Sequence, residues 1–151
     1  MSIAVKTFGE KNPAQKYGRR VCAYLVCQNE EGLIPVAKTP RGYFLLGGGV
    51  EQNEPHRACI RRECREEIGY DAKVRRLFCR SERYHWAARF SRNMHMTGFY
   101  YTGKLLDKLG EPTESNHVLE WLTPSECVEK LLLPNQAWAV KIYLELDDSM
   151  K

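Results

Sequence analysis

Residues 48–70 read GGVEQNEPHRACIRRECREEIGY, and this stretch decides the fold that the sequence predicts. An α-helix would bring three of its glutamates within about 100° of one another, namely Glu63, Glu66 and Glu67. Carboxylates at these spacings repel one another by roughly 0.2–0.5 kcal/mol per pair. The pattern is typical either of a solvated, charged helix face or of carboxylates gathered around a divalent cation such as magnesium or manganese.

The same stretch carries the start and stop signals of a helix over residues 53–68. Asn53 is expected to cap this helix, Pro55 is tolerated in its first turn, and Gly69 is placed to end it. An apolar stripe along the helix should face the core, formed by Ile60, Cys64 and Ile68. The glycines at residues 47–49 allow a sharp bend and a close approach of the backbone to a ligand.

Strands are predicted on both sides of this helix. The apolar and β-branched patterns place them at residues 3–8, 20–28, 33–38, 43–46, 71–81, 94–105 and 117–122. The second and third of these are expected to form a hairpin around the turn at residues 29–32. Residues 82–93 are expected to be a basic, aromatic loop.

Two helices are predicted at the end of the chain. Thr123 and Glu126 fit a capping box that starts a helix ending near Leu132, and Pro134 starts a last helix that reaches about Leu146. Mixed strands, a helix, more strands and further helices predict an α/β (α+β) protein with a mixed sheet.

The composition agrees with one globular domain over residues 1–151. The hydrophobic fraction is 43%, the charged fraction is 28%, and the net charge of +4 is mildly favourable to an anionic ligand. None of the six cysteines forms a C-x-x-C pair, so they are interpreted as reduced, mostly buried thiols of a cytoplasmic protein. No apolar run reaches the roughly 18 residues of a membrane span, so no membrane partner is expected.

At residues 48–70 the chain resembles the Nudix hydrolase family, as a MutT-like member. The Nudix box is written G-x5-E-x7-R-E-U-x-E-E-x-G-U, with U an aliphatic residue. Its seven fixed positions fall on Gly48, Glu54, Arg62, Glu63, Glu66, Glu67 and Gly69. Cys64 and Tyr70 occupy the two U positions, and Leu46 stands where the family often has proline. A weaker resemblance covers most of the remaining chain, including HVLEWLTPSECVEKLL at residues 117–132.

The resemblance implies the Nudix fold, a mixed β-sheet sandwiched between α-helices, and it implies a role for each matched residue. Glu66 and Glu67 would bind a divalent cation, Mg²⁺ or Mn²⁺, together with the backbone carbonyl of Gly48. Glu63 would bind the cation too, or accept a proton from the attacking water. Arg62 would hold the glutamates in place by salt bridges.

Members of the family often use one more acidic residue from a later loop. Three residues are candidates: Glu111, Glu114 and Glu120. Glu114 is preferred as a catalytic residue because it lies in the loop before the last strand. For each of them singly, the alternative is an exposed loop carboxylate without a role.

Substrate-binding residues are expected where basic and aromatic side chains alternate. Residues 80–96 mix four arginines with aromatic side chains, and such pairs can stack a base and hold its phosphates. Arg83 and Trp86 are predicted substrate contacts from this segment, with Arg41 and Tyr43 near the glycine run; Arg20 is a similar candidate. The alternative for the segment is a strand pair with a solvated loop.

The implied activity is hydrolysis of the pyrophosphate bond of a nucleoside diphosphate linked to a group X. The partner would be a small-molecule nucleotide rather than a nucleic acid, and the protein a monomer or homodimer. Two markers of Nudix subfamilies are missing, because His85 and Ala87 stand where proline or tyrosine would follow the box. A nucleotide sensor without turnover and a purely structural domain are the alternatives; the complete set of helix carboxylates argues against both.

Overall fold

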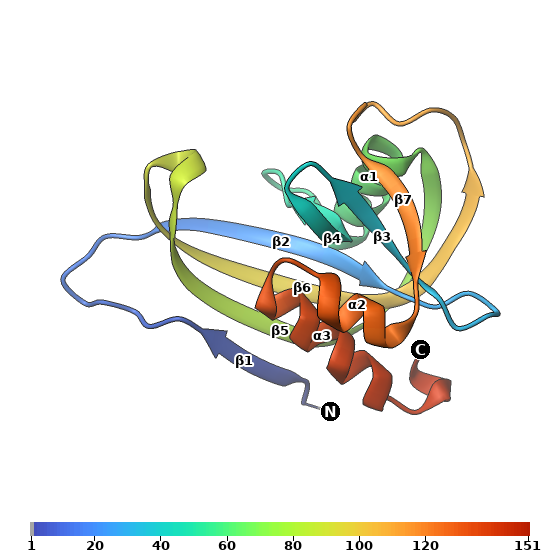
Figure 1. Cartoon of the computed structure of the whole chain (residues 1–151). Helices are drawn as coiled ribbons and strands as arrows, with labels where there is room; N and C mark the ends of the chain where they lie inside the picture. Colours follow the sequence, from blue (N-terminus) through green and yellow to red (C-terminus); the bar gives the residue numbers. More distant parts are fainter. Residues whose placement is uncertain (1) are drawn as a thin grey trace.

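A seven-stranded mixed sheet is the frame of the computed structural model, which describes residues 2–151 (Figure 1). The strands are β1 (Ala4–Phe8), β2 (Gly18–Val26), β3 (Ile34–Thr39), β4 (Gly42–Gly49), β5 (Tyr70–Ala87), β6 (Arg92–Lys108) and β7 (Val118–Leu122). Their order in the sheet is β1-β5-β6-β2-β4-β3-β7. The pairs β1–β5 and β2–β6 are parallel and the others are antiparallel, which confirms the predicted mixed sheet.

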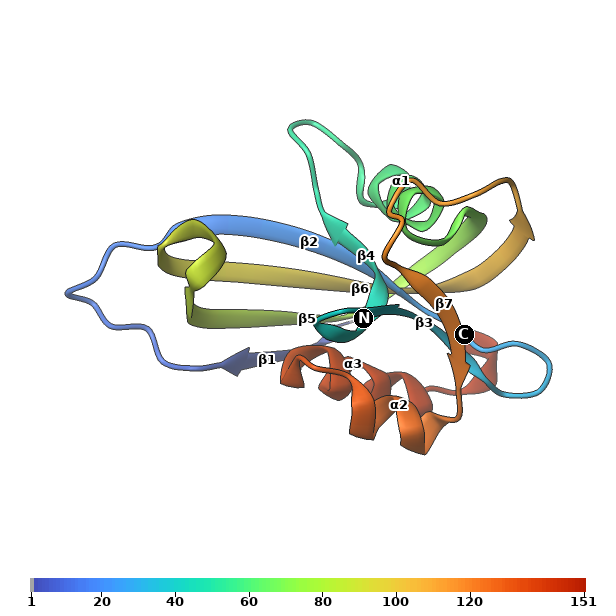
Figure 2. The same ribbon diagram turned by 45° about the horizontal axis from the view of Figure 1, so that its top comes forward.

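Helices cover both faces of this sheet (Figure 2). Helix α1 (His56–Ile68) lies on one face, and α2 (Pro124–Lys130) and α3 (Pro134–Glu145) lie on the other. Strand β2 serves both layers because successive side chains of a strand point to opposite faces: Tyr24 packs in the α2/α3 core and Leu25 in the α1 core. This arrangement confirms the predicted Nudix fold. Short 3-10 turns lie at Ala88–Phe90 and Asp148–Met150.

Helix α1 buries the predicted apolar stripe, but it begins differently from the prediction. Pro55 is its N-cap residue and offers no side-chain cap, while Asn53 has a left-handed φ of 62° and does not cap the helix. The predicted cap at Asn53 is therefore wrong, because this residue lies in a turn that leads the chain into the helix. Gly69 ends the helix as predicted, with a φ of 77° and its N–H bonded to the carbonyls of Cys64 and Arg65.

The predicted hairpin of β2 and β3 is wrong. Strand β4 lies between them and pairs antiparallel with both. Residues Leu45 and Leu46, adjacent in β4, are both fully buried, on the two opposite faces of the sheet. A strand buried on both faces is more stable in the centre of a sheet than at its edge, and it separates β3 from β2.

Strands β5 and β6 form a long arm that replaces the predicted loop at residues 82–93. The pairing continues to Ala87 and Arg92 and closes through the 3-10 turn at Ala88–Phe90. Cross-strand contacts explain the extension, since His95 bonds to Glu82 and stacks on Tyr84 with ring centroids 4.4 Å apart. Such polar and aromatic pairs stabilise the two strands although their residues do not alternate between apolar and polar. The sequence pattern therefore did not predict strands here.

Two smaller predictions are confirmed. Thr123 and Glu126 form the capping box at the start of α2. All six cysteines are free and buried. Among the helices of residues 2–151, none is both long and apolar enough to cross a membrane.

Candidate active site

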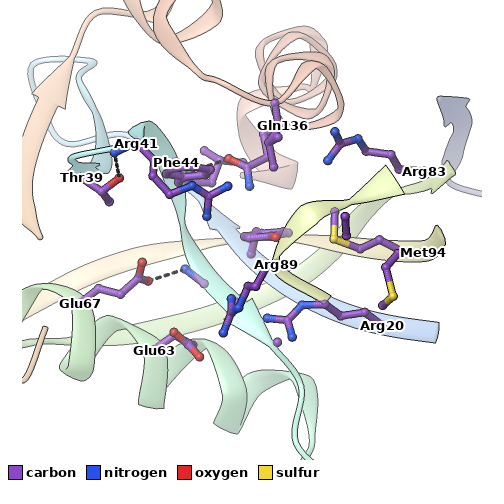
Figure 3. A pocket seen from close by; sticks show the side chains of 18 of the residues that line it. Arg20, Thr39, Arg41, Phe44, Glu63, Glu67, Arg83, Arg89, Met94 and Gln136 are labelled. Atoms are coloured by element: carbon purple, nitrogen blue, oxygen red, sulfur yellow. Dashed lines mark hydrogen bonds between the residues drawn. The ribbon is translucent and has the colours of Figure 1, made fainter. Parts of the chain in front are cut away.

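A cavity of about 690 Å³ opens between α1, the glycine end of β4 and the β5–β6 arm (Figure 3). This volume is in the range of small-molecule sites. Carboxylates of α1 line one side of it, and arginine and aromatic side chains line the other. The cavity therefore combines groups that suit a cation with groups that suit an anionic, aromatic ligand.

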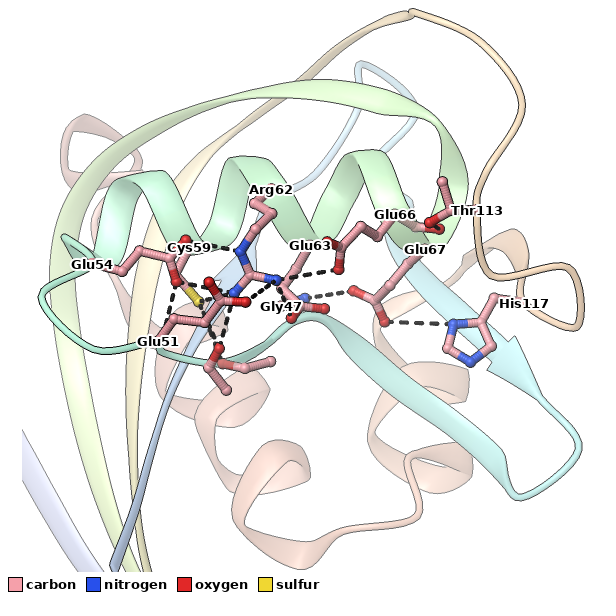
Figure 4. A network of polar contacts seen from close by, with 12 residues as sticks. Gly47, Glu51, Glu54, Cys59, Arg62, Glu63, Glu66, Glu67, Thr113 and His117 are labelled. Atoms are coloured by element: carbon pink, nitrogen blue, oxygen red, sulfur yellow. Dashed lines mark hydrogen bonds and ion pairs between the residues drawn. The ribbon is translucent and has the colours of Figure 1, made fainter.

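Arg62 is the centre of a polar network on α1 (Figure 4). Its guanidinium donates to both oxygens of Glu54, at 2.8 and 2.9 Å. It also donates to Glu63 at 2.9 Å and to Glu66 at 3.2 Å. A further hydrogen bond reaches the carbonyl of Gly49 at 3.0 Å, which ties the helix to the end of β4. The hydrogen bond from Arg62 lowers the pKa of Glu54 to about 2.

Glu67 is the most buried of the three helix glutamates, with 7% of its surface exposed. Its Oε1 accepts a hydrogen bond from the backbone N–H of Gly47 at 3.0 Å. Its Oε2 lies 3.9 Å from Nδ1 of His117, a buried nitrogen that has no hydrogen-bond partner within residues 2–151. Burial raises the pKa of the Glu67 carboxyl well above its usual range, and the neighbouring glutamates add to the rise.

Glu63 lies against the glycine end of β4. A Cβ atom added at Gly48 would fall 2.7–2.9 Å from the carboxyl atoms of Glu63, so a side chain at this position would displace the carboxylate. The Gly48 carbonyl accepts a weak contact from the thiol of Cys59 at 3.5 Å. Burial raises the pKa of Glu63, although its ion pair with Arg62 acts in the opposite direction.

The loop between β6 and β7 brings Glu114 to the same end of the cavity. The backbone N–H of Glu114 donates to the carbonyl of Glu66 at 2.9 Å, and the Thr113 hydroxyl donates to the same carbonyl at 3.4 Å. Carbonyls near the end of a helix lack partners within it, so they are ready acceptors for a passing loop. Of the three candidate loop carboxylates only Glu114 lines the cavity; Glu111 pairs with Lys108 instead.

The donors at this end of the cavity suit a hard divalent cation, because all of them are oxygen atoms. They are the carboxylates of Glu63, Glu66, Glu67 and Glu114 and the carbonyl of Gly48. No three Asp, Glu, His or Cys side chains in residues 2–151 are arranged as ligands around one point. Glu66 accepts a hydrogen bond from Arg62, and Glu67 accepts one from the N–H of Gly47.

Three of the four predicted substrate contacts line the cavity: Arg41, Arg83 and Trp86. Tyr43 does not line it and packs instead against the α2/α3 core, with Lys130 Nζ 5.8 Å from its ring centroid. Its neighbour Phe44 lines the cavity in its place. Tyr43 and Phe44 differ in this way because successive residues of β4 point to opposite sides, and periodicity alone leaves the side open.

Several residues that line the cavity were missed by sequence reasoning, among them Phe44, Gln136 and His117. Phe44 and Gln136 come from segments interpreted only as strand and helix, and Gln136 is buried with its oxygen accepting the Leu45 N–H at 2.8 Å. His117 was placed only at the start of a strand. A glutamine among apolar residues of a helix can indicate a buried polar contact. The sequence does not show whether Gln136 lies on the buried face of its helix.

The comparisons with known proteins identify the family of this chain. A family model described as NUDIX domain matches residues 16–146, and the chain therefore belongs to the NUDIX family. This membership makes it a Nudix hydrolase, an enzyme class that acts on phosphoric anhydrides. A search of curated proteins finds no match.

Solved structures with the same fold include three bacterial proteins. The E. coli ORF135 protein is 22% identical, with 88% of this chain and 94% of that chain covered and a TM-score of 0.63. An ADP-ribose pyrophosphatase from Streptococcus suis is 16% identical, with coverages of 87% and 96% and a TM-score of 0.60. A MutT NUDIX hydrolase from Burkholderia pseudomallei is 20% identical, with coverages of 82% and 97% and a TM-score of 0.56.

Arg62→Lys is expected to lower the free energy of unfolding by about 2 kcal/mol, because lysine loses the two-pronged contact with Glu54 and leaves carboxylates unpaired. The lowered pKa of Glu54 gives this loss a pH dependence. The contact between Arg62 and ionised Glu54 stabilises the fold above the ordinary carboxyl pKa of 4.5, and this stabilisation disappears as the pH falls toward about 2. Urea denaturation at pH 7 and pH 3 measures both effects.

Arg61→Lys is the matched control, since Arg61 pairs with Asp71 at 3.3 Å on the surface of the same helix. A surface pair of this kind contributes less than about 1 kcal/mol. Equal losses in the two variants would show that the network around Arg62 does not stabilise the fold.

Proposed function

We propose that the protein is a divalent-metal-dependent pyrophosphohydrolase. Its substrate would be a nucleoside diphosphate linked to a group X, bound in the cavity between α1 and the β5–β6 arm. The observation that carries this proposal is the convergence of Glu63, Glu66, Glu67 and Glu114 on one end of a cavity whose other wall is basic and aromatic. Mg²⁺ or Mn²⁺ fits the all-oxygen donors of this end.

Each carboxylate takes a role in this proposal. Glu66, Glu67 and Glu114, with the Gly48 carbonyl, would hold the cation, which when bound neutralises phosphate oxygens and acidifies a water molecule. Glu63 would accept the proton of the attacking water, since burial has already raised the pKa of its carboxyl. Arg62 would keep Glu63 and Glu66 aimed toward the cavity through its hydrogen bonds.

The reaction is a substitution at phosphorus by water. The water oxygen forms a bond to one phosphorus atom of the anhydride, and the bond from that phosphorus to the bridging oxygen breaks. The bridging oxygen leaves with the second phosphoryl group, and Glu63 takes the proton of the water. The products are two phosphate esters, or a phosphate ester and an inorganic phosphate or pyrophosphate, depending on X.

The opposite wall of the cavity would bind the nucleotide. Arg41 and Arg83 offer guanidinium groups to phosphates, and Trp86 at the rim, 62% exposed, offers an aromatic face for a base. We place the enzyme in the cytoplasm, because six free thiols suit a reducing compartment. We expect it to be a monomer or a homodimer.

A phosphate-release screen over a nucleotide panel with Mg²⁺ tests the proposal. We expect turnover of at least one nucleotide by the wild type and a loss of about 100-fold or more in Glu66→Gln, which removes a ligand charge from a half-exposed site. Glu111→Gln is the control, because Glu111 is an exposed acid outside the cavity and should leave turnover unchanged.

Two outcomes would contradict the proposal. Equal activity of wild type and Glu66→Gln would remove Glu66 from the proposed metal site. Absence of turnover of every nucleotide by the wild type, with nucleotide binding intact, would favour a sensor that binds without hydrolysis.

A further inference from the structure

The outer part of the β5–β6 arm concentrates the positive charge of the molecule. This outer arm consists of residues 80–97 and of residues 9–20, which run beside them and enter β2. The two segments hold eight of the 23 basic residues of the chain but only two of its 19 acidic residues. They therefore carry a net charge of +6, while the rest of the chain carries −2. Such a surface attracts an extended polyanion.

Most of the basic residues of the outer arm lie outside the candidate active site. Three of the eight line the cavity, namely Arg20, Arg83 and Arg89. The other five do not line it: Lys11, Lys16, Arg19, Arg80 and Arg92. The outer arm therefore has positive charge beyond that of the cavity wall.

One face of the outer arm belongs to a sheet of four strands, in the order β1-β5-β6-β2. The start of α1 marks the inner limit of this face, because the ring of His56 packs on the ring of Phe99 with centroids 4.6 Å apart. Beyond Phe99 the arm extends away from α1, and no α-helix of residues 2–151 lies over this face (Figures 1 and 2). The cavity is on the other face, where Arg83 and Met96 point.

Six side chains form the open face of the outer arm beyond Phe99: Arg19, Arg80, Glu82, Tyr84, His95 and Thr97. Glu82 is the one carboxylate among these six, and it is already paired. It lies 2.7 Å from Nε2 of His95 and 3.5 Å from Nε of Arg80, and it accepts a hydrogen bond from Thr97. Arg19 is exposed and donates to the Thr97 hydroxyl at 2.9 Å, so its charge remains available to a phosphate.

Aromatic rings lie beside Arg19 on the open face. Tyr84 and His95 stack with ring centroids 4.4 Å apart and planes at 20°, and Tyr17 meets Tyr84 edge-on at 5.4 Å. The His95 side chain is 22% exposed, and the register of β2 and β6 places Arg19 next to it. Every nucleic acid base has an aromatic face that can extend a stack of this kind, and a neighbouring arginine can bind the phosphate that follows.

This combination fits a single strand better than a duplex. The bases of a duplex stack on one another, whereas a single strand can turn its bases toward a protein. Open four-stranded sheets bind two or three bases of a single strand on aromatic residues of their central strands. Tyr84 and His95 occupy the corresponding strands, because β5 and β6 are the two central strands of the four.

We propose that the open face of the outer arm binds single-stranded nucleic acid, with bases stacked on Tyr84 and His95 and a phosphate bound by Arg19. The site lies on the opposite side of the sheet from the cavity, so it does not depend on the proposed hydrolase activity. A bound strand would hold the protein on a nucleic acid while the cavity stays open to small nucleotides.

Fluorescence anisotropy with labelled oligonucleotides tests this inference. The probes are RNA and DNA strands of about 12 nucleotides with one mixed sequence, a 5′-hydroxyl group and a 3′ label, and the corresponding DNA duplex. The 5′-hydroxyl group leaves no phosphoric anhydride for the cavity. At about 50 mM salt we expect the wild type to bind a single strand with a Kd of about 10 μM or less, and about ten-fold more tightly than the duplex. Comparison of the two single strands decides between RNA and DNA.

Two variants of the open face should weaken this binding in different ways. Tyr84→Leu removes a stacking surface and should raise the Kd about ten-fold. Arg19→Gln replaces an exposed side chain, which leaves folding intact; it should raise the Kd about three-fold and lower the slope of log Kd against log salt concentration by about 0.7. Two controls should keep the wild-type affinity: Arg75→Gln, an exposed arginine at the other end of β5, and Arg83→Gln on the cavity side.

Four results would overturn the inference. The first is no binding of either single strand, and the second is equal binding by the wild type and both open-face variants. A loss of affinity in Arg83→Gln alone would assign the strand to the cavity. Binding to phosphatidylserine vesicles that Arg19→Gln weakens, with no preference for a single strand over the duplex, would make the open face a membrane-binding surface instead.

Discussion

Replacing Gly47 by alanine is expected to destabilise the protein by more than about 3 kcal/mol, because two costs add at this position. The φ of Gly47 is 137°, a conformation that residues with a side chain rarely adopt. A Cβ atom there would also collide with the carbonyl oxygen of Ala23 and lie 2.7 Å from the Cα of Tyr24, both in the backbone of the paired strand β2. Backbone in the centre of a sheet has little freedom to move away.

The same substitution should disturb the site. The N–H of Gly47 donates to Glu67, so a displaced strand would remove the hydrogen bond that positions the most buried glutamate. Urea denaturation followed by circular dichroism measures the loss of stability, and a variant that fails to fold agrees with the expectation.

Gly110→Ala is the control for the Gly47 prediction. Gly110 has no positive φ, and a Cβ atom added there would meet no atom within 4 Å. Its substitution should change stability by less than about 1 kcal/mol. If both alanine variants unfold at the same urea concentration, the close packing of Gly47 against β2 is refuted.

Glu67→Gln is expected to stabilise the metal-free protein while abolishing turnover. Burial of the charged carboxylate is unfavourable, and the neutral amide removes this cost while its oxygen keeps the hydrogen bond from Gly47. The gain at pH 8 should be about 1–3 kcal/mol. Loss of a proposed metal ligand should lower kcat by about 1000-fold, which corresponds to about 4 kcal/mol of transition-state stabilisation.

The direction of the pH dependence follows from the raised pKa of Glu67. A carboxyl whose pKa is higher in the folded state binds its proton more tightly there than in the unfolded chain. The folded protein therefore incurs no penalty below the unfolded pKa of about 4.3, and loses stability as the pH rises above it toward the raised folded value. The difference between Glu67→Gln and wild type should grow between pH 5 and pH 8.

Urea denaturation in EDTA at these two pH values measures the effect, and addition of Mg²⁺ should restore stability to the wild type more than to the variant. Glu66→Gln serves as the control, since the Glu66 side chain is 38% exposed and its charge is better solvated. A Glu67→Gln protein that is less stable than wild type at pH 8 in EDTA would show that the buried charge is already compensated.

Most of the local structure was predictable because it depends on neighbours along the chain. The stop at Gly69, the capping box at Thr123 and the apolar stripe of α1 follow from backbone conformation and helical spacing. The wrong predictions of the fold concern pairing between segments that are distant along the chain. The position of β4 between β2 and β3, and the length of the β5–β6 arm, depend on contacts that no local pattern reports.

The residues of the site divide in the same way. The helix glutamates and Arg62 were predictable because helical spacing places them on one face. Glu114 was one of three candidates, and its loop reaches the cavity through a hydrogen bond to the Glu66 carbonyl. Tyr43 and Phe44 were indistinguishable from sequence, because the side of the sheet that each faces depends on what packs there.

The sequence by itself determined the helix with its three glutamates, the glycine run before it and the family of the protein. These features depend only on residues at fixed, short spacings along the chain. Only the tertiary structure decided that Arg20, Arg41, Arg83 and Arg89 line one cavity together with the glutamates. These arginines are separated by up to dozens of residues, and only sheet pairing and the arm bring them together. In the proposed function, their charge would attract the phosphates of the substrate.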